Sequence, residues 1–155
     1  MNNIVCFFSA SGITKTIAQK IKNTINSNIF EIIPETLYTK EDLDWTNKQS
    51  RSSVEMQNLE SRPKIKEKIN NIDSCDTIIL GYPIWWDKAP TIINTFIEEN
   101  NINNKNVYVF ATSGGSQVEE SFLRLKEQYP NINFINIKRF FGNETEEEIK
   151  KWLNM

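Results

Sequence analysis

The residues of this sequence best suited to chemistry follow an apolar run near its start. The run Ile4–Phe8 gives way to a turn of small and hydroxyl-bearing residues: Ser9, Ala10, Ser11, Gly12, Ile13 and Thr14. If a buried strand leads through this turn into a helix, the unpaired N–H groups of the first helical turn and the helix dipole attract an anion. The hydroxyls would add donors, and Gly12 permits a positive φ. The pattern predicts a phosphate site, and an ordinary polar turn is the simpler alternative.

Other phosphate-binding motifs fit this turn less well. A Walker loop places a glycine four residues before a Gly-Lys-Ser/Thr triplet, whereas the order here is Gly12-Ile13-Thr14-Lys15-Thr16. The dinucleotide fingerprint requires three spaced glycines, and this turn contains one. A mononucleotide therefore fits better than ATP or NAD. Lys15 either assists the phosphate or lies in solvent.

Two further loops follow apolar runs later in the chain. One is aromatic and contains Pro83, Ile84, Trp85 and Trp86; the other is small and flexible and contains Thr112, Ser113, Gly114, Gly115 and Ser116. With the first loop they predict a site for a phosphorylated molecule with a flat, hydrophobic ring system. The simpler alternatives are that the tryptophans are core or dimer residues and that the glycines form a plain turn.

Strand and helix patterns alternate along the chain and would position these loops. Apolar runs predict strands over 4–8, 29–33, 77–82, 107–111 and 132–137. The alternation predicts an α/β fold with three layers, in which an open, doubly wound parallel sheet of five strands carries helices on both faces. Ligands of such a sheet bind beyond the carboxyl ends of its strands, where the three loops lie.

Periodic isoleucines and capping residues predict the helices. Ile13, Ile17, Ile21 and Ile25 would pack one helix on the sheet, and a short helix would run from Arg62-Pro63 through Ile65, Ile69 and Ile72. Asp87 is expected to cap the helix that contains Ile92–Ile97, and Val118–Tyr129 supplies another helical face. Thr145 and Glu148 match a capping box before the last helix. The polar segment Glu35–Arg62 shows no periodicity and is either functional or mobile, with Trp45 as a cover for the site or a partner contact.

Composition limits the chemistry of the chain. Its 155 residues fit a single domain over 1–155, and the absence of histidine excludes Ser-His-Asp triads and most catalytic metal sets. We therefore expect no catalytic residue and no metal site, and a cofactor would carry any difficult reaction. Cys6 and Cys75 read as small buried hydrophobes, and the net charge of −2 argues against nucleic-acid binding. With no long apolar run and no signal peptide before the first strand, a soluble, cytoplasmic protein is expected.

The three loops, taken in order, resemble those of the flavodoxin family, in particular its short-chain members with a Pro-Ile-Trp-Trp loop. The resemblance covers essentially the whole chain and rests on Ser9–Thr14, Gly81–Trp86 and Thr112–Ser116. It implies strand order 2-1-3-4-5, non-covalent FMN and low-potential electron transfer between redox partner proteins, a reductase and an electron acceptor, by a monomer or weak dimer. An aromatic wall with no cation beside the ring would agree with a low potential, because it disfavours the anionic reduced flavin.

Two departures from the family keep a second function open. The Asp-x-x-Tyr element of the third loop is replaced by Ser113–Gln117, and Asp87 stands where a small residue is common. Without the tyrosine, a nicotinamide or quinone would have room above the ring. The alternative is therefore an FMN-dependent NAD(P)H oxidoreductase that reduces a quinone, azo or nitro compound, and whether the chain is an enzyme stays open. A signalling receiver of the same topology needs acidic residues after the first strand, where this chain has Ser9-Ala10-Ser11.

Overall fold

The computed structural model describes residues 2–155, and across that range a single sheet of five parallel strands runs in the order β2-β1-β3-β4-β5. The strands are β1 (Asn3–Phe7), β2 (Asn28–Glu31), β3 (Thr77–Pro83), β4 (Asn106–Thr112) and β5 (Asn133–Arg139). The helices are α1 (Ile13–Ile25), α2 (Arg51–Gln57), η1, a short 3₁₀ helix (Ile72–Ser74), α3 (Thr91–Glu99), α4 (Glu119–Gln128) and α5 (Glu146–Trp152). This order confirms the predicted doubly wound α/β fold.

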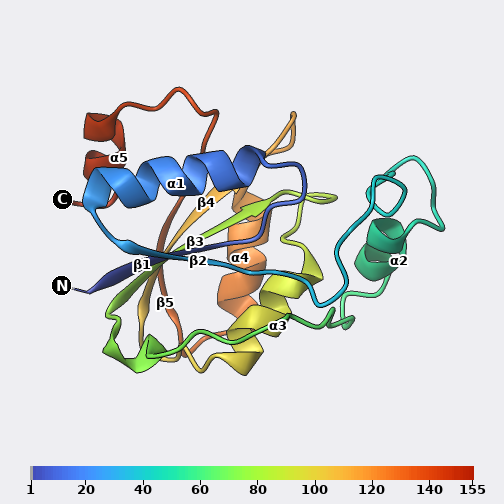
Figure 1. Cartoon of the computed structure of the whole chain (residues 1–155), viewed down its shortest axis with the longest axis horizontal. Helices are drawn as coiled ribbons and strands as arrows, with labels where there is room; N and C mark the ends of the chain where they lie inside the picture. The colour runs from blue at the N-terminus through green and yellow to red at the C-terminus, as the bar shows by residue number, and fades with distance from the viewer. Residues whose placement is uncertain (1) are drawn as a thin grey trace.

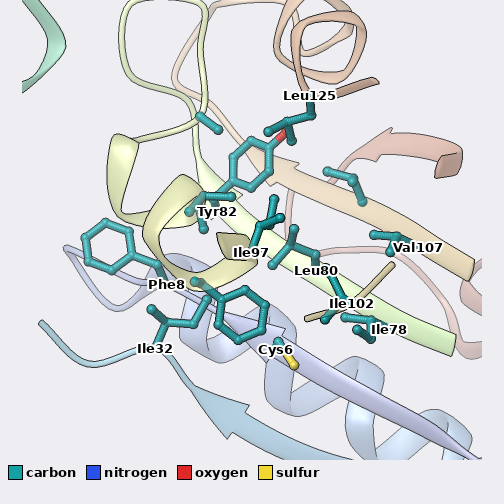
Figure 2. Packing of buried hydrophobic residues seen from close by; sticks show 14 of the residues in the cluster. Cys6, Phe8, Ile32, Ile78, Leu80, Tyr82, Ile97, Ile102, Val107 and Leu125 are labelled. Atoms are coloured by element: carbon teal, nitrogen blue, oxygen red, sulfur yellow. The ribbon is translucent and has the colours of Figure 1, made fainter. Parts of the chain in front are cut away.

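The sheet is covered on both faces, as its continuous apolar strands require. Helices α1 and α5 lie on one face, and α3 and α4 lie on the other (Figure 1). Side chains of β1 alternate between the two layers: Cys6 and Phe8 face α3, and Val5 and Phe7 face α1. Figure 2 shows the α3 side, where Phe8, Leu80 and Tyr82 pack together. Cys6 and Cys75 are free and buried, as predicted, and burial raises the pKa of the Cys6 thiol.

One glycine of the sheet is required by close packing between neighbouring strands. A Cβ atom at Gly81 in β3 would lie 2.0 Å from Cζ of Phe110, which belongs to the adjacent strand β4. Phe110 is completely buried, and its ring packs edge-on against Phe140 at 5.8 Å. The ring therefore fills the space over Gly81, at the start of the aromatic loop.

Three local predictions are wrong. The helix expected from Arg62 to Ile72 is absent: residues 62–71 are not helical, Pro34 forms an antiparallel bridge with Ile65, and the only helix nearby in residues 2–155 is η1. Hydrogen bonds to residues far along the chain hold the extended backbone, among them Glu35 N–H to Lys64 C=O at 2.8 Å. These contacts outweigh the weak helical pattern.

The other two errors concern helix starts. Asp87 does not cap α3, because the N-cap is Pro90 and Asp87 has a left-handed φ of 64° in a turn. Ile13 is 60% exposed rather than packed on the sheet, although Ile17 and Ile21 are buried as expected. The capping box of α5 is confirmed, since Thr145 and Glu148 each bond the other's backbone N–H.

The polar segment between β2 and β3 forms a lobe with its own helix. Residues 36–61, called the insert below, contain α2 and lie beside the carboxyl ends of the strands (Figure 1). Arg51 lies 3.8 Å over the Tyr38 ring, pairs with Glu55 at 3.0 Å and donates to the Thr36 carbonyl at 2.7 Å. At its end, Ser61 hydrogen-bonds Thr91 of α3 at 2.9 Å. Arg51 thus ties α2 to the start of the insert, and Ser61 joins the end of the insert to the body.

Candidate functional site

The turn between β1 and α1 presents unpartnered N–H groups. Within residues 2–155 the backbone amides of Ala10, Ser11, Ile13 and Thr14 donate to no protein acceptor, and the exposed Ser11 hydroxyl has no partner either. Gly12 has a φ of 95°, which directs the chain from the turn into α1. Several donors at the start of a 13-residue helix form the geometry that binds a phosphate.

Two other hydroxyls of the turn act within the protein. Ser9 Oγ accepts from the amides of Gly12 at 3.1 Å and Lys15 at 3.2 Å, so it fixes the turn from inside. Thr14 is buried and its hydroxyl pairs with that of Thr112 at 2.8 Å, which ties the first loop to the third. Lys15 extends away, and its ammonium pairs with Glu31 at 3.2 Å. The donors left for an anion are therefore mainly amides.

The aromatic loop is a tight turn that fixes one tryptophan and exposes the other. Trp85 and Lys88 exchange two backbone hydrogen bonds, of 2.9 and 3.0 Å, around Trp86 and Asp87. Both central residues have a positive φ, 49° and 64°, as in a type I′ turn, although such turns favour asparagine and glycine. Trp85 packs edge-on against Phe8 at 5.7 Å and Tyr38 at 5.6 Å, whereas Trp86 is 43% exposed.

The third loop is braced from both ends. The Ile84 amide donates to the Thr112 carbonyl at 2.8 Å, and the Ser113 hydroxyl donates to the Ser116 carbonyl at 2.8 Å. Gly114 and Gly115 have space around them, because a Cβ atom at either would meet nothing within 4 Å. The loop consequently offers a backbone edge with open space beside it.

Two adjoining cavities lie between these loops. The first, of about 540 Å³, is lined by Ala10, Ser11, Leu43, Trp45, Ser52, Pro83, Ile84, Trp85, Trp86, Asp87 and Ser116. The second, of about 330 Å³, is lined by Ser11, Ile13, Pro83, Ile84, Trp85, Thr112, Ser113, Gly114, Phe140 and Phe141. The structure therefore brings the three predicted loops together at one place. Ser9, Gly12, Thr14 and Gly115 line neither cavity; the first three shape or brace the turn from behind.

The insert and the residues after β5 add further side chains to the site, of which sequence reasoning named Trp45, as a cover or a partner contact, and missed the others. Leu43, Trp45 and Ser52 form the wall that the insert contributes, and Ser52 is buried with a hydroxyl that has no partner in the described part of the chain. Phe140 and the exposed Phe141 close the other side. Trp45 stands out in the sequence as an isolated large aromatic in a polar segment. Nothing in the local sequence shows where the other four side chains point.

Two cationic side chains contact the loops, although neither lines a cavity. Lys88 Nζ lies 3.4 Å from the Trp86 carbonyl oxygen, and Arg139 Nη2 donates to the Ser113 carbonyl at 3.0 Å. Both cations therefore touch the backbone of loops that line the cavities. Positive charge there favours an anionic form of a bound ring, which opposes the effect of the aromatic wall on a reduction potential.

The residues of the site are suited to binding a ligand. No three His, Cys, Asp or Glu residues of the described chain lie together as a metal site. Between Asn2 and Met155 no helix is long and apolar enough to cross a membrane. The donors and aromatic walls instead suit a molecule with a phosphate at one end and a flat ring at the other, and such a molecule would itself supply the redox chemistry.

Comparisons with known proteins agree with this description. A family described as flavodoxin matches the chain over residues 2–155. A candidate flavoprotein from Bacteroides eggerthii DSM 20697 is similar, with 44% identity and a TM-score of 0.95 over 99% of this chain and 96% of that chain. Another from Bacteroides uniformis ATCC 8492 has 40% identity and a TM-score of 0.92 over 99% and 98% of the two chains.

A more distant structure shares the fold. A flavoprotein from Lactobacillus acidophilus NCFM, crystallised in complex with FMN, has 23% identity and a TM-score of 0.76, with 98% of each chain covered. Among curated proteins, none matches the sequence. Because the family match extends over residues 2–155 and two solved structures exceed 30% identity across it, the chain belongs to the flavodoxin family.

Proposed function

We propose that this protein binds FMN between the three loops and acts as an electron carrier. The observation that carries the proposal is the set of unpartnered amides at Ala10, Ser11, Ile13 and Thr14, which suits the phosphate of a mononucleotide. When bound, FMN would supply the uptake and release of electrons, which no side chain of the site provides.

The chain's own residues would hold and shield the cofactor. Ser11 would donate its hydroxyl to the phosphate, and Ser9 would keep the turn in shape. Pro83, Ile84 and Trp85 line both cavities and would form the apolar wall beside the ring. The edge of the third loop, Ser113 to Ser116, would provide backbone contacts along the ring's polar side. The family's use of FMN and the complex of the Lactobacillus acidophilus flavoprotein support this assignment.

An exposed rim supports the role of carrier. Trp86 is 43% exposed and Phe141 is 66% exposed, and they border the first and second cavities respectively. A docked protein could therefore approach the ring closely. We propose that a reductase delivers electrons and an acceptor protein removes them, in the cytoplasm, with the chain acting as a monomer or weak dimer. The aromatic wall would lower the reduction potential of the bound ring, and the positive charges of Lys88 and Arg139 beside the loops would moderate this effect.

Titration of the apoprotein with FMN tests the proposal, with binding followed by quenching of flavin fluorescence. Ser11→Asp places a carboxylate among the phosphate donors, and we expect the dissociation constant to rise at least about tenfold, which corresponds to roughly 1.4 kcal/mol. Asn23→Asp makes the same charge change at an exposed position of α1 and should leave binding unaltered. A wild-type protein that does not bind FMN, or equal affinity in both variants, would contradict the proposal.

One observation favours the oxidoreductase alternative. The third loop lacks an aromatic side chain, and open space surrounds Gly114 and Gly115. A nicotinamide or a small acceptor could approach the ring there. Rapid oxidation of NADPH by the FMN-loaded protein with benzoquinone, and without an added reductase, would decide for the enzyme and against the carrier.

A further inference from the structure

A third cavity adjoins the site but belongs almost entirely to the insert. It has a volume of about 580 Å³ and is lined by Trp45, Thr46, Lys48, Ser53, Met56, Gln57 and Trp86. None of these residues comes from the phosphate turn or the third loop. Trp45 and Trp86 also line the first cavity, so the two indoles stand between the two spaces. We call this space the Trp45–Trp86 pocket.

The two indoles of this pocket lie outside the buried core. Trp45 is 73% exposed and Trp86 is 43% exposed, whereas Trp85, their neighbour, packs edge-on against two buried or half-buried rings. Trp86 is moreover held at a positive φ of 49°, which is unfavourable for a bulky side chain. Strain of this kind is typical of residues placed for binding, and here it sets an indole at the junction of the two cavities.

The polar groups around the pocket are mostly occupied by one another. Ser53 Oγ donates to the Asn47 carbonyl at 2.7 Å, Thr46 Oγ1 donates to Asp44 at 2.5 Å, and the Gln57 amide nitrogen donates to the Lys48 carbonyl at 2.9 Å. The Lys48 ammonium forms no ion pair with any described residue. The pocket thus offers apolar aromatic surface, a pliable methionine and one free cation.

We propose that the Trp45–Trp86 pocket binds a planar aromatic molecule that carries a carbonyl or acid oxygen. The ring would lie against the indoles, and the oxygen would accept a hydrogen bond from Lys48. The volume lies within the usual range for small-molecule sites, roughly 300–1,000 Å³. The inference rests on the proposed function in one respect: beside an FMN site, such a ligand is positioned as an electron acceptor.

The pocket is braced from within the insert. Arg51 and Glu55 tie α2 to Tyr38, whose ring packs on Phe8 and Trp85 of the body, and Ser50 caps α2 by accepting from the Ser53 amide at 3.3 Å. The Tyr38 hydroxyl also donates to Glu55, and burial, followed by that hydrogen bond, raises the pKa of Tyr38. The ring therefore stays neutral at physiological pH and keeps its bond.

Equilibrium dialysis with anthraquinone-2-sulfonate tests the proposal, on both the apoprotein and the FMN-loaded protein. This probe is planar and carries both carbonyls and an acidic group. Trp45→Ala should weaken its binding roughly three- to tenfold, as loss of an aromatic contact does. Leu37→Ala removes an equally exposed side chain (67%) of the insert that lines no cavity described here, and it should have no effect. Lys48→Met should weaken binding of the sulfonate more than that of 1,4-naphthoquinone, which is uncharged.

The outcomes separate this inference from the proposed function. The pocket is supported if the probe binds equally with and without FMN. Trp45→Ala must also weaken this binding while Leu37→Ala leaves it unchanged. Absence of binding, an unaltered affinity in Trp45→Ala, or displacement of the probe by FMN overturns it. If the probe binds as expected while FMN does not bind at all, the proposed function fails and the pocket stands.

Discussion

The two sides of the candidate site are held by different forces. On one side, the three loops follow directly from β1, β3 and β4, and backbone hydrogen bonds such as Ile84 N–H to Thr112 C=O join them to each other. On the other side, the insert reaches the site through side chains, mainly the ring contacts of Tyr38 with Phe8 and Trp85, while the clasp of Arg51 on Tyr38 ties α2 to this anchor within the insert.

The candidate site therefore joins a part fixed by the sheet to a part that can loosen by itself. The strand-end loops cannot move without disturbing the sheet, so they suit a ligand that must always be held in one place. The insert can loosen by breaking a few side-chain contacts, because regions with few buried apolar contacts open at low free energy. We therefore expect changes in the sheet to destabilise the whole protein, and changes in the insert to act locally.

The largest expected effect comes from crowding the sheet beneath the aromatic loop. Gly81→Ala would place a methyl group 2.0 Å from Cζ of Phe110, whose ring is buried against Phe140. Urea unfolding should show a loss of about 3 kcal/mol, at the upper end for overpacking. Combining the change with Phe110→Leu should recover part of that loss. An unfolding midpoint equal to that of the wild type would show that β3 and β4 are not packed as described.

Loosening the insert should have a smaller and more local effect. Arg51→Met removes the cation over Tyr38, the ion pair with Glu55 and the bond to the Thr36 carbonyl. The free energy of local opening should fall by about 2 kcal/mol, the range of hydrogen bonds to charged groups. Hydrogen exchange would detect faster amides in 38–57 with unchanged protection in β1, β3 and β4. Lys40→Met, an exposed residue of the same segment, is the control, and equal acceleration in the strands would refute the local clasp.

Relaxing the aromatic loop should stabilise the protein modestly. Asp87 has a φ of 64°, so Asp87→Gly removes the cost of a left-handed side chain in the turn. Thermal unfolding should show a gain of about 0.5 kcal/mol, since Asp tolerates this region better than most residues. The same change at Asp73, in the first turn of η1, should bring no gain. Destabilisation by Asp87→Gly would indicate that the carboxylate has a structural role.

A similarly small effect concerns the ion pair that ties Arg62, just after the insert, to Glu98 of α3, and it depends on pH. Hydrogen bonding to Arg62, 3.0 Å away, holds the pKa of Glu98 below its ordinary value. A lowered folded-state pKa stabilises the protein above the unfolded pKa, near roughly 4.3, and this contribution disappears as pH falls through the folded pKa. Arg62→Met should therefore cost about 0.5 kcal/mol more at pH 7 than in acid, because the pair is exposed and the bonds of Arg62 to the Leu59 and Ser61 carbonyls do not depend on pH. Lys64→Met serves as the control, and a difference independent of pH would contradict the ion pair.

Much of the sheet and the loops could be predicted because their signals are local. Continuous apolar runs such as Thr77–Tyr82 indicate strands buried on both faces, and a capping box such as Thr145 with Glu148 marks a helix start within four residues. The order of the three loops was enough to place them at one edge, since every strand of a parallel sheet ends on the same side.

The insert and the segment after it could not be predicted, because long-range contacts decide their structure. The isoleucines at 65, 69 and 72 match a helical period, yet pairing of Ile65 with Pro34 keeps the chain extended. Helix α2 carries no apolar stripe in its sequence and is stabilised by the Ser50 cap and the Arg51 clasp. Neither the buried position of Ser52 nor the contact of Arg139 with the third loop has a signature in neighbouring residues.

The internal bonds of the phosphate turn also bear on the order of events in binding. Because Ser9 and the pair of Thr14 with Thr112 have already restricted the turn, its conformational entropy is lost during folding rather than on contact with a ligand. Trp45, by contrast, is 73% exposed, so the cost of ordering its indole falls on the binding step. A ligand with a phosphate tail would accordingly dock by its tail on a rigid cradle first, and its ring would settle afterwards as the indole becomes ordered.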